Sequence, residues 1–121
     1  MMFSELGTTS RYQMNVPFEN DVVYVGIGRS NFATYNHGSA VVGRWIGSRT
    51  SATDLTLYKN GSSVATNTSS NAGATLSNID VVLLNGFVGV CGFQFGGDGL
   101  NSSEVSTLDG HLSTFLTAIG R

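Results

Sequence analysis

Several residue types are scarce in this 121-residue chain. Cysteine and proline occur once each, and charged residues make up only 12 % of the sequence, with a formal net charge of −2. The lone Cys91 excludes an intramolecular disulfide, and its apolar surroundings (GVCGF) indicate a packed core thiol and not a nucleophile. The six basic residues are scattered, whereas nucleic-acid backbones are bound by clustered Lys and Arg, so we expect no nucleic-acid partner.

Long hydrophobic runs are also missing. No apolar run approaches the roughly 20 residues of a membrane-spanning helix, so we expect no membrane association. The first residues, MMFSELGTTSR, lack a basic region followed by an apolar one and therefore do not indicate a signal peptide. We expect a chain made in the cytoplasm, in which the glycosylation-type triplets at Asn60, Asn67 and Asn101 are ordinary polar turns.

Glycine is abundant, with 16 residues, and Ser, Thr and Asn crowd the segments between short apolar runs. This composition is typical of all-β proteins, which need many tight turns. Runs rich in β-branched and aromatic residues predict short strands at residues 21–27, 31–38, 40–49, 81–85 and 87–95. The length allows one core, so we expect a single domain over residues 1–121, in which residues 1–20 form an extended N-terminal arm.

Residues 54–68 (DLTLYKNGSSVATNT) predict a β-hairpin. Asn60-Gly61 suits a two-residue type I′ turn, because both central residues must adopt a positive φ. Side chains alternate along a strand, so Leu55 and Leu57 should share one face while Thr56 and Tyr58 share the other. The polar residues after the hairpin predict a surface loop.

The periodicity changes near the C-terminus. From Val105 to Ile119 the apolar residues form one helical stripe, made of Val105, Leu108, Leu112, Phe115, Leu116 and Ile119. Asn101 and Glu104 fit a capping box, and Gly120 suits the helix end. We therefore predict a helix over residues 101–120 that docks on the sheet and belongs to the core.

Two stretches of the chain carry a family resemblance. WIGSRTSATDLTLYKNGSSVATNT (residues 45–68) resembles a strand and hairpin of the concanavalin-A-like, or laminin-G-like, jelly rolls of bacteriophage and bacterial surface proteins. GDGLNSSEVSTLDGHLSTFLTAIGR (residues 97–121) resembles the terminal helix of the same proteins. The resemblance implies an all-β antiparallel sandwich of the jelly-roll type with one C-terminal α-helix. These relatives usually extend further on the N-terminal side, so some strands are expected to be missing, shortened or supplied by a neighbouring chain.

The same resemblance implies a place in a phage virion, as a capsid-decorating or a tail- or fibre-associated surface protein. Exposed sheet edges in so small a sandwich are usually covered, so we expect a homo-oligomer or other virion proteins as partners. The alternative is a lectin-like module that binds a cell-surface glycan. Tyr35, Asn36, His37 and Trp45 are its candidate residues, because aromatic faces and amides bind sugars; for Trp45 core packing is the stronger alternative.

No catalytic constellation can be assembled from the sequence, so we expect no enzyme. Glu19 and Asp21 form an acid pair of the kind used by jelly-roll glucanases, but Tyr24 stands where the third acid belongs, and a solvated strand start explains the pair. The histidines, His37 and His111, are not expected to share a metal. No cofactor is expected, since only isolated loop carboxylates are available for calcium, at Asp54, Asp80 and Asp98.

Overall fold

A computed structural model describes eight segments of the chain, and Cys91 and the run 87–95 lie outside them. The segments are residues 3–4, 12–18, 21–27, 32–39, 42–51, 53–69, 82–83 and 99–120. Among the loop and strand carboxylates considered above, Glu19, Asp80 and Asp98 also fall outside them.

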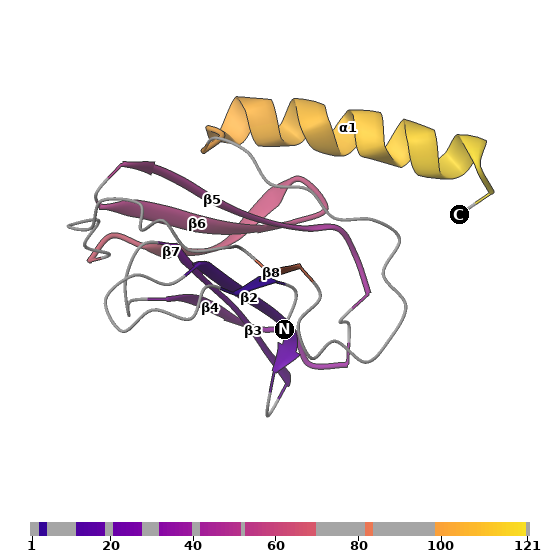
Figure 1. Ribbon diagram of the computed structural model, residues 1–121. Helices are drawn as coiled ribbons and strands as arrows, with labels where there is room; N and C mark the ends of the chain where they lie inside the picture. Colours follow the sequence, from indigo (N-terminus) through magenta and orange to yellow (C-terminus); the bar gives the residue numbers. More distant parts are fainter. Residues whose placement is uncertain are drawn as a thin grey trace.

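The described segments are mostly β, with two antiparallel sheets and one C-terminal helix (Figure 1). The elements, in chain order, are β1 (Phe3–Ser4), β2 (Tyr12–Phe18), β3 (Val22–Ile27), β4 (Ala33–Asn36), β5 (Trp45–Ser51), β6 (Asp54–Lys59), β7 (Ser62–Asn67), β8 (Val82–Leu83) and α1 (Ser102–Ala118). This composition confirms the predicted β class and the C-terminal helix. The jelly-roll strand order stays a prediction.

The larger sheet has the strand order β4-β3-β2-β1-β8, and all its neighbouring strands are antiparallel. Residues 12–18, which the sequence assigned to an N-terminal arm, instead form β2. The backbone of β2 pairs with β1 on one side and with β3 on the other, so this segment lies inside the sheet. In β3, Val23 and Val25 are fully buried, as expected for β-branched residues on the inner face of a sheet.

The smaller sheet has the order β5-β6-β7 and contains the predicted hairpin. Lys59 pairs with Ser62 across the turn, and Asn60 and Gly61 have φ angles of 49° and 77°. The two-residue turn with two positive φ angles is thereby confirmed. It forms because glycine carries no Cβ and asparagine tolerates the left-handed region better than most residues.

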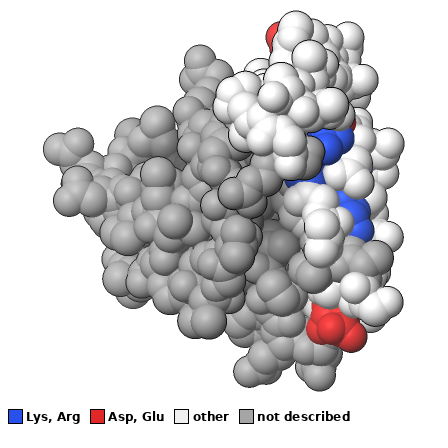
Figure 2. All heavy atoms as spheres, turned by 90° about the vertical axis from the view of Figure 1, so that its right-hand side faces the viewer, with Lys and Arg blue, Asp and Glu red and all other residues white. Residues whose placement is uncertain are grey.

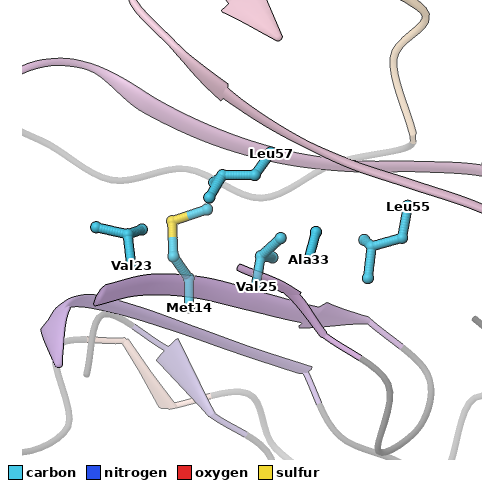
Figure 3. Close-up of a cluster of buried hydrophobic side chains, with 6 residues drawn as sticks. All are labelled: Met14, Val23, Val25, Ala33, Leu55 and Leu57. Carbon is cyan, nitrogen blue, oxygen red and sulfur yellow. The ribbon is translucent and has the colours of Figure 1, made fainter. Parts of the chain in front are cut away.

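The two sheets face each other across a cluster of buried apolar side chains, drawn in Figure 3. The larger sheet contributes Met14, Val23, Val25 and Ala33, and the smaller sheet contributes Leu55 and Leu57. At Gly47 the two sheets approach closely, because an added Cβ would overlap the Val25 side chain. Glycine at this position therefore lets β5 pack directly against β3.

The helix α1 begins with the predicted capping box. The Asn101 side chain accepts hydrogen bonds from the amides of Ser103 and Glu104, and the Glu104 carboxylate accepts one from the Asn101 amide at 2.8 Å. These bonds satisfy amides that the first helical turn leaves without partners. At the other end Gly120 has a φ of +76°, so it closes the helix in the left-handed conformation.

Helix α1 covers the outer face of the smaller sheet, opposite the larger sheet (Figure 1). Its apolar contact consists of Val105, which is fully buried, packed with Ile46 and Tyr58 from the strands and with the half-buried Leu100 and Leu108. Leu55 and Leu57 point to the inner cluster while Tyr58 points to the helix, as the alternation along β6 predicted. Strand β6 is therefore buried on both faces.

The expectation that the whole apolar stripe of the helix joins the core is wrong. Val105 is buried, but Phe115 and Ile119 are 54 % and 55 % exposed. The reason is geometric, since the last turns of the helix extend past the end of the sheet (Figure 1). Of the described residues, no helix combines the length and hydrophobicity that crossing a membrane requires.

Candidate functional site

Two of the four predicted glycan-binding residues lie together at one end of the sheets. Tyr35 in β4 and Trp45 at the start of β5 have ring centroids 6.2 Å apart, with planes tilted by 51°. The Lys59 ammonium lies 5.0 Å from the centroid of the Trp45 ring, because Lys59 is the cross-strand partner of Trp45. Both rings are half-buried and pack against the inner core cluster. The arrangement combines core packing with a cation–π contact.

The other two predicted residues, Asn36 and His37, lie at the end of β4 and directly after it. Asn36 is exposed, and its side-chain oxygen accepts a hydrogen bond from the Gly38 amide at 2.9 Å, as in an Asx turn. His37 is 8 % exposed, and its amide donates to the Asp21 carbonyl at 2.9 Å. Neither nitrogen of its ring has a hydrogen-bond partner among the described residues. The four residues therefore do not form one open surface.

The described carboxylates support the fold. Asp21 is exposed at the start of β3 with a φ of 61°, and its expected partner Glu19 lies outside the described residues. Asp54 accepts hydrogen bonds from the hydroxyls of Thr50, at 2.8 Å, and Thr56, at 3.3 Å. Within the described segments, no three His, Cys, Asp or Glu side chains are grouped as a metal site would require.

A contact that the sequence did not indicate joins the helix to the sheet. Arg44 binds Asp109 with both ends of its guanidinium: Nε donates to Oδ1 at 2.6 Å and Nη2 donates to Oδ2 at 2.9 Å. The side chains are 29 % and 12 % exposed, respectively. The hydrogen bonds to Asp109 raise the pKa of Arg44 above its ordinary value, the attraction between the charges adds to this, and burial opposes it.

The β6–β7 turn takes part in the same contact. The backbone of Arg44 exchanges two hydrogen bonds with Asn60, one from the Asn60 amide to the Arg44 carbonyl and one from the Arg44 amide to the Asn60 side chain. A Cβ on Gly61 would stand 3.1 Å from Asp109. We name the set Arg44, Asn60, Gly61 and Asp109 the helix latch. Its only sequence signal is that Asp109, four residues after Val105, falls on the apolar side of the helix.

Beyond the helix latch, α1 presents apolar side chains to the surface. Phe115 and Ile119 are exposed, and so is Val42, at 88 %, two residues before Arg44. Figure 2 looks onto this end of the molecule, where the described surface carries blue Lys and Arg atoms near its middle and red Asp or Glu atoms below them and at its upper edge. The exposed side chains of Phe115 and Ile119 are apolar area of the kind that another protein surface covers.

Comparisons with known proteins do not assign this chain to a family. No family model matches it, and neither the curated proteins nor the solved structures contain a match. Function must therefore be inferred from the chain's own residues, which combine an aromatic pair, a latched helix and an apolar helix end.

Proposed function

We propose that this chain is a non-enzymatic structural or recognition module of a phage virion, in a capsid-decorating or tail- or fibre-associated position. The resemblance of residues 45–68 and 97–121 to concanavalin-like jelly rolls supplies the viral context. Two facing antiparallel sheets with a C-terminal helix are compatible with a sandwich of that type, and the jelly-roll order is part of the proposal. Proteins of one fold can have many different functions, so a more specific function has to be inferred from the residues on the surface.

One observation carries the proposal, namely the exposure of Phe115 and Ile119 on the last turns of α1. Large apolar side chains that continue a buried stripe into solvent indicate a surface that another protein covers. The neighbouring polar groups have structural partners: Arg44 binds Asp109, and Glu104 caps the helix. This use of charge inside the fold supports a structural role over a catalytic one.

The proposal predicts that the protein is physically part of a particle. Phage particles from a culture of the host that carries the coding sequence would be purified on a density gradient, and each fraction would be analysed by mass spectrometry. We expect peptides of this chain to co-sediment with the particles at a constant ratio to the other virion proteins. A chain found only in the soluble fraction at the top of the gradient would reject the virion role.

A lectin-like role is the second candidate, favoured by the Tyr35–Trp45 pair with the Lys59 ammonium beside it. A glycan array probed with the isolated chain would test it. A lectin should lose binding on Trp45→Phe, which keeps an aromatic side chain in the core but removes the indole. Thermal unfolding of this variant would establish that it is still folded. Tight, Trp45-dependent sugar binding would replace the structural role with the lectin role.

The non-enzymatic part of the proposal has its own test. The chain would be incubated with plant and bacterial polysaccharides beside a Glu19→Gln, Asp21→Asn variant. We expect no product from either protein. Turnover by the parent chain that the double substitution abolishes would show that the acid pair is catalytic.

A further inference from the structure

The β6–β7 turn places a chemically reactive pair of residues at the surface. Asn60 is exposed, and it is followed by Gly61, which has no side chain to shield its backbone nitrogen. In an Asn-Gly pair this nitrogen can attack the Cγ carbon of the asparagine side chain, and glycine offers the least steric hindrance to the attack. Asparagine counts among the thermolabile residues of proteins. The second such pair of the chain, Asn85-Gly86, lies outside the described residues.

The fold leaves the attacking nitrogen without a hydrogen-bond partner. Gly61 lies between the two strands of the hairpin, and within the described residues its amide donates no hydrogen bond. An amide that donates no hydrogen bond loses none when it becomes a nucleophile. The barrier to reaction must therefore come from the other partner, the Asn60 side chain.

That side chain is held in the turn. Its Oδ1 accepts a hydrogen bond from the Arg44 amide at 3.0 Å, while the backbone at Asn60 and Gly61 has φ angles of 49° and 77°. Ring closure requires the side chain to rotate until Cγ faces the Gly61 nitrogen, with the reacting atoms aligned about 3 to 3.5 Å apart. The hydrogen bond to Arg44 opposes this rotation. The turn therefore has to release Asn60 before the pair reacts.

Release of the turn is coupled to the helix through Arg44. The Arg44 backbone exchanges two hydrogen bonds with Asn60, and its guanidinium binds Asp109 of α1 by two more. Gly61 also lies against Asp109. A segment of a folded protein opens locally only when the contacts that hold it are broken. The ion pair between Arg44 and Asp109 therefore adds to the free energy of opening the turn.

We propose that Asn60 is a site of spontaneous modification to iso-aspartate and aspartate, and that the helix latch controls the rate. The Gly61 nitrogen loses its proton and bonds to Asn60 Cγ, the Cγ–Nδ2 bond breaks, and ammonia leaves with that proton, so a cyclic imide forms. Water then cleaves the imide. Cleavage at the main-chain carbonyl gives iso-aspartate, and cleavage at the side-chain carbonyl gives aspartate. This inference goes beyond the proposed virion role and does not rest on it.

Either product changes the helix latch. Both carry a carboxylate at position 60, next to Gly61, against which the Asp109 carboxylate lies, and neighbouring like charges repel. Iso-aspartate also carries the main chain through the former side chain, which adds one backbone atom to a two-residue turn. The length of that turn sets the pairing of Lys59 with Ser62. Because ammonia is lost, the modification loosens the latch in one direction only.

Peptide mapping by tandem mass spectrometry tests the proposal on the full chain, incubated at mildly alkaline pH to favour deprotonation of the attacking amide. The method distinguishes deamidation at Asn60 from deamidation at Asn85, and it separates aspartyl from iso-aspartyl peptides. The parent chain should accumulate both forms at position 60. Arg44→Met removes the ion pair but keeps the backbone, so it should react about tenfold faster, a factor that corresponds to about 1.4 kcal/mol of latch stability.

Arg49→Met is the matched control. It makes the same exchange near the other end of β5, where the Arg49 guanidinium donates to the carbonyls of Ile27 and Ser51. It should react at the rate of the parent chain. Asn60→Gly keeps a residue that accepts a positive φ and should show no modification at this position. Circular dichroism melts establish that each variant is folded during incubation; if Arg44→Met is not, Asp109→Ala takes its place.

Three results would contradict the proposal. Equal acceleration by Arg44→Met and Arg49→Met would overturn it, because global unfolding would then set the rate. It would also be overturned if Asn60 stayed intact in both the parent chain and Arg44→Met while the urea-unfolded chain reacted. The iso-aspartyl form, purified by anion exchange, should unfold at a lower urea concentration than the parent chain. An identical midpoint would overturn the claim that the modification loosens the latch.

Discussion

The ion pair of the helix latch, between Arg44 and Asp109, should be a measurable part of the protein's stability, because it joins the helix to the residue directly before β5. A double-mutant cycle isolates it. Asp109→Asn keeps the side-chain volume and removes the charge, and Arg44→Met keeps most of the apolar stem while removing the guanidinium. The backbone hydrogen bonds between Arg44 and Asn60 remain available in both variants.

The expected magnitude follows from the geometry of the pair. Hydrogen bonds to charged groups contribute about 1.5 to 3 kcal/mol, and a bidentate Arg–carboxylate pair lies at the favourable end. Arg44 is 29 % exposed, so water screens part of the attraction. We therefore expect a coupling energy of about 1 to 2 kcal/mol, and a loss of roughly 1.5 to 2.5 kcal/mol in each single variant. For a chain of this size that loss lowers the Tm by roughly 4 to 12 °C.

The appropriate assay is urea unfolding monitored with two probes. Far-UV circular dichroism reports on the helix, and the fluorescence of Trp45, the single tryptophan, reports on the sheets. Glu104→Gln is the control, because it alters the helix cap but leaves the pair intact. The loss of stability caused by Glu104→Gln should add to the loss caused by Arg44→Met. A coupling energy below about 0.3 kcal/mol, the usual error of additivity, would refute the claim that this pair holds the helix on the sheet.

Three further substitutions test the fold at single glycines and at the turn. Gly110→Ala should stabilise the protein by about 0.5 to 1 kcal/mol, because an added Cβ meets nothing within 4 Å; a lower Tm by calorimetry would contradict the open surface. Gly47→Ala should destabilise it by about 1 to 3 kcal/mol, since the new methyl overlaps Val25; unchanged urea unfolding would show that the sheets are further apart. Replacing Asn60 and Gly61 together by Ala should destabilise the protein by about 1 to 3 kcal/mol, because both residues have a positive φ. An unaltered Tm would show that the turn does not contribute to stability.

Local features of this fold could be predicted from the sequence because their causes are local. The turn at Asn60-Gly61 needs two adjacent residues that accept a positive φ, and those residues are adjacent in the chain. The capping box depends on Asn101 and Glu104, three positions apart. In both cases a few neighbouring residues contain the whole physical reason for the structure.

Contacts between distant segments could not be predicted in the same way. Arg44 and Asp109 are 65 residues apart, and nothing in either neighbourhood indicates the partner. The place of residues 12–18 inside the larger sheet was missed for a similar reason. Strand pairing depends on the partner's edge as well as on the strand's own residues, so β2 is evident only beside β1 and β3.

The candidate glycan residues show that a residue type suited to binding sugars can lie in an environment other than an exposed binding face. Aromatic rings suggested a sugar-binding face, and Tyr35 and Trp45 do lie together. Strand alternation nevertheless turns them toward the core, whereas the adjacent Asn36 points the other way and bonds its own turn. Sequence can name residues able to bind sugars, but the choice of strand face decides whether their rings meet solvent.

The helix stripe shows what periodicity can and cannot determine. A repeat of three and four residues identifies the side of a helix that avoids water, and Val105 does lie on the buried side. The repeat contains no information about the length of the surface underneath. That length is set by where β5 begins and where the β6–β7 turn closes, and the helix passes both after Asp109. The apolar row therefore continues for ten residues beyond the part of the helix that its own sheet supports. Only a second surface that covers these residues would remove them from water.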